Sequence, residues 1–156
     1  AGFTRLFAER LNELSAMQVK EAQDGDSVIP GRVLIAPGEM QLEVVRSGGS
    51  YKVKVATGEK VNGHCPSVEV LMNSAAKALG RHAVGVMLTG MGRDGAKGLL
   101  AMREAGAQTL AQDEKSCVVF GMPKAAWEIG AAEKLVPLSK IADTVLDCLS
   151  KKEELV

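Results

Sequence analysis

Several residue types are scarce in this 156-residue chain, and each scarcity excludes a class of protein. Aromatic residues make up only 3%, too few for the stacking platforms on which proteins hold single-stranded nucleic acid. Lys and Arg together number 19, as do Asp and Glu, so the formal net charge is zero. A protein that binds phosphate backbones needs a basic surplus, so the composition argues against a nucleic-acid partner.

Metal-ligating residues and long apolar runs are also scarce. The three cysteines (Cys65, Cys117 and Cys148) lie far apart and form no CxxC pair, which argues against a disulfide framework or zinc site and favours a reducing compartment. The two histidines, His64 and His82, have no metal-ligand spacing to a cysteine or carboxylate. No apolar run approaches the ~20 residues of a membrane span. We therefore expect no metal, no cofactor, no membrane insertion and a cytoplasmic location.

Hydrophobic periodicity predicts an α/β protein. The run 83–88 is continuously apolar, as is typical of a parallel strand buried on both faces. Strand and helix signals alternate around it, which predicts a doubly wound, mostly parallel sheet with one antiparallel β-hairpin. The predicted helices are 3–14 (N-cap Thr4), one opening at Pro66 and Ser67 and ending at Gly80, 96–105, 122–129 and a last one capped by Ser139; the predicted strands are 19–22, 33–36, 42–46, 51–55, 83–88, 109–111 and 134–138.

The glycine-rich turn 90–95 is the segment best placed for chemistry, because ligands of open α/β sheets sit beyond the carboxyl ends of the strands. Asp94 lies inside it and has three interpretations. It could cap the following helix. The turn could bind a dinucleotide, since Gly90, Gly92 and Gly95 satisfy G-x-G-x-x-G and Asp113 follows about 20 residues later. Asp94 could instead orient a catalytic histidine supplied by another segment, which requires its carboxylate to project from the turn into an open crevice.

Four separated motifs favour the third interpretation. In register along nearly the whole chain, they resemble the catalytic domain of the bacterial chemotaxis receptor methylesterases, the CheB family: LTGMGRDGAKG at 88–98, VNGHCPSV at 61–68, AQDEKSCVVFGMP at 111–123 and IAPG at 35–38. The resemblance implies a serine hydrolase that removes methyl esters from glutamyl side chains on the cytoplasmic helices of chemoreceptors and deamidates certain receptor glutamines. It also implies a doubly wound domain, usually preceded by an inhibitory receiver domain.

Site residues can be carried over only where the motifs match. Asp94 matches the aspartate of the family's Ser-His-Asp triad, and the main-chain N–H of Met91 matches an oxyanion donor. His64, Asn62, Gly92 and Arg93 are candidate substrate contacts. The alternatives for them are a loop histidine at His64, a turn residue at Asn62 and a solvated arginine at Arg93.

One departure from the family pattern concerns the other two triad members. The family's serine lies in a glycine-rich turn near the start of its domain and its histidine follows on the next strand, and neither segment has a match here. The chain also begins with Ala1 and enters a helix at once, as if cut from a larger protein. We therefore expect residues 1–150 to be a partial methylesterase domain, inactive alone, followed by a frayed tail at 151–156.

Two further expectations follow. Because the unmatched part of the family domain supplies two strands, the apolar face of the helix 3–14 should be incompletely packed. Two other functions remain open, namely a dinucleotide-binding domain that uses Gly90, Gly92, Gly95 and Asp113, and a non-catalytic module that docks on receptors.

Overall fold

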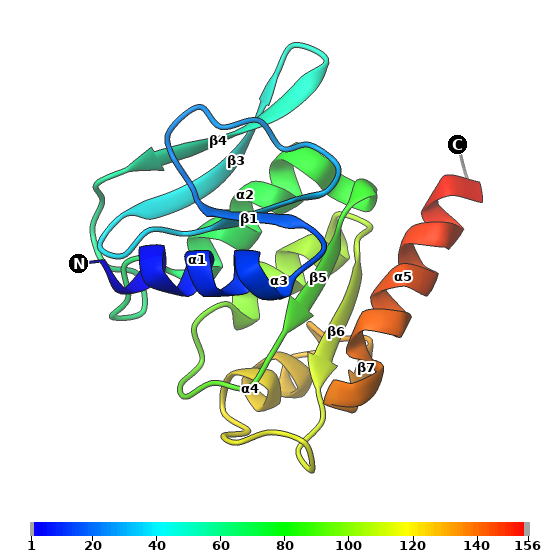
Figure 1. Cartoon of the computed structure of the whole chain (residues 1–156). Helices are drawn as coiled ribbons and strands as arrows, with labels where there is room; N and C mark the ends of the chain where they lie inside the picture. The colour runs from blue at the N-terminus through cyan, green and yellow to red at the C-terminus, as the bar shows by residue number, and fades with distance from the viewer. Residues whose placement is uncertain (1, 155–156) are drawn as a thin grey trace.

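The computed structural model describes the backbone of residues 2–154 and the side chains of residues 2–151. Helices and strands alternate along most of the chain, as the sequence predicts (Figure 1). The elements in order are α1 (Phe3–Leu14), β1 (Gln18–Glu21), β2 (Arg32–Ile35), β3 (Gln41–Ser47), β4 (Ser50–Ala56), α2 (Val68–Leu79), the 3₁₀ turn η1 (Gly80–His82), β5 (Val84–Met87), α3 (Ala96–Glu104), β6 (Gln108–Gln112), α4 (Met122–Glu128), β7 (Lys134–Val136) and α5 (Leu138–Glu154).

The strands form three small sheets. β1 and β2 pair in parallel, β3 and β4 form the antiparallel hairpin, and β5, β6 and β7 form a parallel sheet in that order. Helices α3 and α4 contact this last sheet, and α5 contacts β5 and β6 from the other side (Figure 1). The predicted α/β class, parallel pairing and hairpin are therefore confirmed, with the parallel strands divided between two sheets.

The main core lies between α2, α3 and the three-stranded sheet. Leu99 and Ala111 are fully buried in it, together with Met72 and Met87. The helices α2 and α3 cross closely at Gly98, where an added Cβ would lie 2.8 Å from Met72 Cβ. This close crossing fixes the N-terminus of α2 beside the turn that precedes α3.

The apolar face of α1 is largely uncovered. Phe3 is 77% exposed, and Leu6, Phe7 and Leu14 are also exposed, whereas Ala8 is buried. Incomplete packing of this helix was the expectation, and it is confirmed. The rings of Phe3 and Phe7 stack on each other with centroids 6.4 Å apart.

Some predicted details are wrong. Val84 and Val86 of β5 are only partly buried, whereas Gly85 and Met87 are buried, so the strand is not covered equally on both faces. Helix α1 has Gly2 at its N-cap position, and Thr4 lies inside the helix, where its hydroxyl donates to Glu21 Oε2 and accepts from Gly38 N.

The ends of two other elements also differ from prediction. Ser139 lies inside α5, which begins at Leu138, and the N–H of Leu138 donates to Ser116 Oγ at 3.0 Å. His82 ends a 3₁₀ turn, and β5 begins at Val84, one residue later than predicted. Helix α5 continues to Glu154, and residues 155 and 156 lie outside the described residues, so the domain bounds 1–150 and the tail 151–156 stay a prediction.

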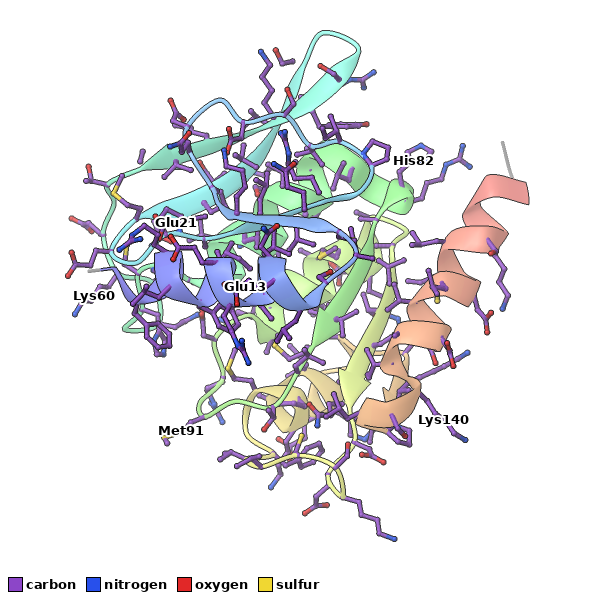
Figure 2. All side chains as sticks on the ribbon, in the orientation of Figure 1. Glu13, Glu21, Lys60, His82, Met91 and Lys140 are labelled. Carbon is purple, nitrogen blue, oxygen red and sulfur yellow. The ribbon has the colours of Figure 1, made fainter. Side chains whose placement is uncertain are left out.

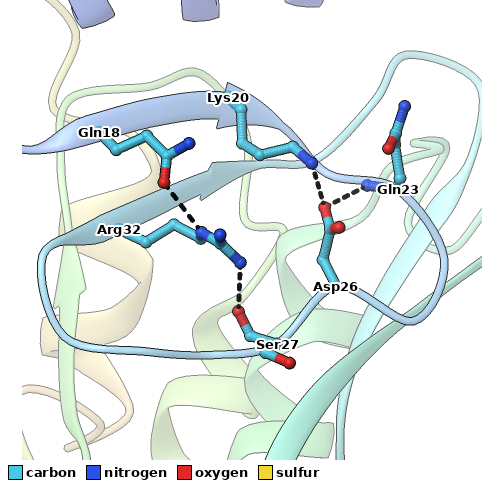
Figure 3. A network of polar contacts seen from close by, with 6 residues as sticks. All are labelled: Gln18, Lys20, Gln23, Asp26, Ser27 and Arg32. Carbon is cyan, nitrogen blue, oxygen red and sulfur yellow. Dashed lines mark hydrogen bonds and ion pairs between the residues drawn. The ribbon is translucent and has the colours of Figure 1, made fainter.

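A polar network holds the loop between β1 and β2 (Figure 3). Asp26 Oδ2 accepts from the main-chain N–H of Gln23 at 2.8 Å and pairs with Lys20 Nζ at 2.9 Å. Arg32 donates to Gln18 Oε1 and to the carbonyl of Ser27. The N–H of Gln23 is the largest influence on Asp26, and with Lys20 it outweighs burial and lowers the pKa of the carboxyl.

None of the helices between residues 2 and 154 combines the length and the apolar character needed to cross a lipid bilayer.

Candidate active site

The turn that follows β5 lies at the carboxyl edge of the parallel sheet. β5 and β6 run in the same direction, so the segments after both strands emerge at this edge. They also contact each other directly: Gly90 forms a parallel bridge with Phe120, and the N–H of Met122 donates to Gly90 O at 2.8 Å. The sheet thus places Asp94 and Met91 where the sequence predicted a site.

Asp94 is held by the N-terminus of α2. Its Oδ1 accepts from Ser67 Oγ at 2.8 Å and from Asn62 Nδ2 at 3.0 Å, and its Oδ2 accepts from Val68 N at 2.8 Å. The helix N-terminus offers unpaired N–H groups and a positive dipole end, which stabilise a carboxylate.

These contacts keep Asp94 ionised. Burial alone would raise the pKa of the carboxyl, but the hydrogen bonds from Asn62, Ser67 and the main-chain N–H groups of Val68 and Glu69 outweigh it. The pKa of Asp94 is therefore lower than its ordinary value. A carboxylate of this kind suits a role as a fixed negative charge.

The expectation that the Asp94 carboxylate projects into an open crevice is wrong. The residue is 4% exposed, and its carboxylate faces α2 instead of standing free in a crevice. It does not cap its own helix either, since Gly95 is the N-cap residue of α3 and makes no side-chain cap. The capping interpretation therefore holds for a different helix, α2, because the close crossing of α2 and α3 brings Val68 to the turn.

Met91 lies at the outer tip of the same turn. Its side chain is 78% exposed and extends away from the protein (Figure 2). Its main-chain N–H makes no hydrogen bond to any part of the chain that the structure describes. The next residue, Gly92, has φ +93°, a left-handed conformation that favours glycine. The exposed tip of the turn thus carries a main-chain donor without a partner among the described residues.

Three of the four candidate substrate contacts line two cavities that share Arg93. A cavity of about 260 Å³ is lined by Asn62, Glu69 and Arg93, among others, and a second of about 250 Å³ is lined by Gly92, Arg93 and Gly121. Both also involve Ala125 and Glu128 of α4. The structure thus brings Asn62, Gly92 and Arg93 together, and their role as substrate contacts stays a prediction.

The two histidines are placed differently. His64 is exposed and pairs through its backbone with Val61, two residues from Asn62. His82 lies at the far side of the protein from Met91 (Figure 2). Neither imidazole is hydrogen-bonded to Asp94.

Sequence reasoning missed two neighbours of Asp94. Ser67 was predicted only as a helix cap, which is confirmed by its contact with Val70 N, but its hydroxyl also donates to Asp94. Glu69 accepts from Asn62 Nδ2 at 2.9 Å and from Gly98 N at 3.2 Å. No spacing in the sequence links these residues, because the contact depends on how α2 crosses α3.

Asp113, the acidic residue of the dinucleotide alternative, is already engaged. Its Oδ1 accepts from the N–H and the hydroxyl of Ser116. These contacts close the turn after β6, so they favour a structural role for Asp113.

Fold and site together define a doubly wound α/β protein with an ionised carboxylate and a free main-chain donor at the carboxyl edge of its parallel strands. The CheB methylesterase family model matches residues 1–145. The chain is 63% identical over 152 residues to a protein-glutamate methylesterase/protein-glutamine glutaminase of Syntrophotalea carbinolica, and 56% identical over 153 residues to one of Sulfurimonas denitrificans. The chain belongs to the CheB methylesterase family.

The extent of these matches differs between the chain and its relatives. Each match covers nearly all of this chain, 97% and 98%, but only 43% and 44% of the relative. The crystal structure of the Thermotoga maritima CheB methylesterase catalytic domain superposes with a TM-score of 0.90 at 38% identity. That match covers 94% of this chain and 77% of the Thermotoga chain.

Proposed function

We propose that this chain supplies the aspartate and an oxyanion donor to the active site of a protein-glutamate methylesterase that also acts as a protein-glutamine glutaminase. The observation that carries the proposal is the buried, ionised Asp94 beside the unpaired N–H of Met91, in a chain of the CheB family. The relatives are named for this pair of reactions.

In this proposal the nucleophilic serine and the base come from residues with no counterpart in this chain. The serine hydroxyl attacks the ester carbonyl carbon while the histidine takes its proton, and the histidine then returns a proton to the departing methanol. Water hydrolyses the acyl-enzyme by the same route. Asp94 accepts the imidazole N–H, fixes its tautomer and stabilises the imidazolium, and the N–H of Met91 stabilises the negative oxygen of the tetrahedral intermediate.

The hydrogen bonds of Asp94 fit this role. Ser67, Asn62 and Val68 hold the carboxylate from the α2 side, so it needs no rearrangement when the imidazole becomes charged. An aspartate with a lowered pKa stays ionised throughout, as the mechanism requires.

Substrate and setting follow from the same proposal. The substrates are methylated glutamyl side chains on the cytoplasmic helices of chemoreceptors, which places the reaction in chemotaxis and the protein in the cytoplasm. Asn62 and Arg93 line one of the two cavities, Gly92 and Arg93 line the other, and these three residues are proposed to contact the receptor helix. His64 lies close in sequence and is proposed to contribute at the rim of these cavities. The same proposal includes a receiver domain that acts on the methylesterase domain.

The test uses a chimaera in which this chain replaces the matching 152 residues of the Syntrophotalea relative. We expect the chimaera to release methanol from methylated receptor, and the 156-residue chain alone to release none. A chimaera that folds but releases no methanol would refute the proposal, and release by the chain alone at a comparable rate would refute its dependence on a serine and histidine from elsewhere.

Two variants of the chimaera assign the role of Asp94. We expect Asp94→Asn to lower kcat by about 10⁴-fold, because the amide favours the wrong imidazole tautomer. The matched control is Asp26→Asn, which removes another carboxylate with a lowered pKa in the loop after β1 and should leave kcat unchanged. Receptor binding without hydrolysis in the unsubstituted chimaera would favour the docking module instead.

A further inference from the structure

Gln112 is a buried polar side chain that the proposed mechanism does not use. It is the last residue of β6 and is 1% exposed. Its Oε1 accepts from the main-chain N–H of Thr89 at 2.8 Å, and its Nε2 donates to the carbonyl of Ser116 at 2.8 Å. One carboxamide therefore joins the segment after β5 to the turn after β6.

Thr89 completes the junction between the two segments. Its hydroxyl donates to Val119 O at 3.0 Å and accepts from Val119 N at 2.9 Å. The N–H of Gly90 also donates to Val119 O, at 3.1 Å. The Thr89 hydroxyl is thus fixed both as a donor and as an acceptor, and the Thr89 N–H is fixed as a donor, in each case by residues from the β6 side.

The two segments then approach so closely that only glycine fits. An added Cβ at Gly121 would lie 2.7 Å from Gly90 O, 3.1 Å from Gly92 N and 3.3 Å from Met91 Cα. The backbone around Met91 therefore rests directly on the segment that Gln112 and Thr89 hold in place.

We propose that Gln112 is a positioning residue that aims the main-chain N–H of Met91 at the reacting carbonyl oxygen; this rests on the proposed function. The N–H of Met91 has no partner within the described residues, so only its neighbours set its direction. Thr89, two residues earlier, is anchored by Gln112. The role needs a carboxamide, because one group must accept from Thr89 and donate to Ser116 at once.

The experiment compares Gln112→Met in the Syntrophotalea chimaera with the unsubstituted chimaera. Methionine keeps the length and unbranched shape of glutamine and removes both hydrogen bonds. We expect kcat to fall by about ten- to hundred-fold, the loss typical of a displaced catalytic group, with KM changed less than about two-fold. Hydrogen–deuterium exchange of the amides over residues 88–95 should accelerate selectively.

Thr109→Val is the matched control. Thr109 lies three residues earlier on the same strand, is fully buried and donates to the carbonyl of Ala131 at 2.6 Å. This variant also loses a buried side-chain hydrogen bond of β6, but away from the turn, so it should leave kcat and exchange over 88–95 unchanged.

Two results would overturn the positioning role. One is a Gln112→Met protein with unchanged exchange over 88–95; the other is a loss of kcat that Thr109→Val reproduces. The exchange measurement does not depend on catalysis. If the unsubstituted chimaera were inactive, the proposed function would fail, and accelerated exchange in Gln112→Met would still support the anchoring of Met91 by Gln112.

Discussion

Ser67→Ala tests whether α2 and the turn of Asp94 are coupled through a charged hydrogen bond. Ser67 is 2% exposed, and its hydroxyl is shared between the Asp94 carboxylate and the cap of α2. Alanine removes both contacts without adding volume. We expect the variant to fold with lower stability in urea, measured by circular dichroism.

The size of the effect follows from the two distances. The contact with Asp94 is 2.8 Å long and involves an ionised acceptor, so its loss should cost about 1.5–3 kcal/mol. The contact with Val70 N is 3.5 Å long, so the cap should contribute only the lowest value for such residues, about 0.5 kcal/mol. Their sum is about 2–3.5 kcal/mol at pH 7.

The cost should depend on pH. The folded-state pKa of Asp94 lies below its unfolded value of about 3.9, so ionised Asp94 contributes stability in full above that pH. The contribution is lost as the pH falls through the folded pKa. Removing the Ser67 donor raises the folded pKa toward its ordinary value, so the difference between the two proteins should shrink below about pH 4.

Ser74→Ala on the same helix is the control. Its hydroxyl accepts from Val44 N at 2.8 Å and donates to Leu71 O at 2.7 Å, and both partners are uncharged. This variant should also lose stability, but by an amount independent of pH between 7 and 3. If the cost of Ser67→Ala were equally independent of pH, the charged hydrogen bond would be refuted.

Three further outcomes are expected. Gly98→Ala should destabilise the chain by about 1–2 kcal/mol in urea, because its Cβ would lie 2.8 Å from Met72 Cβ and 3.0 Å from Glu69 O. This overpacking exceeds the roughly 1 kcal/mol gain in helix propensity. A stabilised variant would contradict the close crossing of α2 and α3. Asp26→Asn should lose stability at pH 7. Because the pKa of Asp26 is lowered in the folded state, this loss should shrink as the pH falls below about 4 and through the folded pKa; an equal loss at pH 7 and pH 3, by chemical denaturation, would contradict this. In the chimaera, Met91→Pro removes the main-chain N–H and should lower kcat by about 10²–10³-fold, whereas Met91→Ala keeps the N–H and should not. Equal kcat values for these two variants would exclude the oxyanion role.

Local patterns predicted the elements well. Alternation of apolar and charged residues identified the β3–β4 hairpin, and Ser67 and Gly80 marked the two ends of α2 as predicted. The caps at Thr4 and Ser139 were wrong: the Thr4 hydroxyl accepts from Gly38 N, and the N–H of Leu138 at the start of α5 donates to Ser116 Oγ. Sequence patterns report contacts within a few residues, and these contacts span up to 34 residues.

The amino-acid sequence by itself determined the α/β class, the order of elements, the family and the turn that carries Asp94, because each depends on periodicity or on residues adjacent in the chain. Only the tertiary structure decided how that carboxylate is held. Its partners Ser67, Val68 and Asn62 are 26 to 32 residues away, and they meet Asp94 because Gly98 allows α3 to pack directly on α2. The same is true of Gln112 and Thr89, which are neighbours only because β5 and β6 pair in parallel.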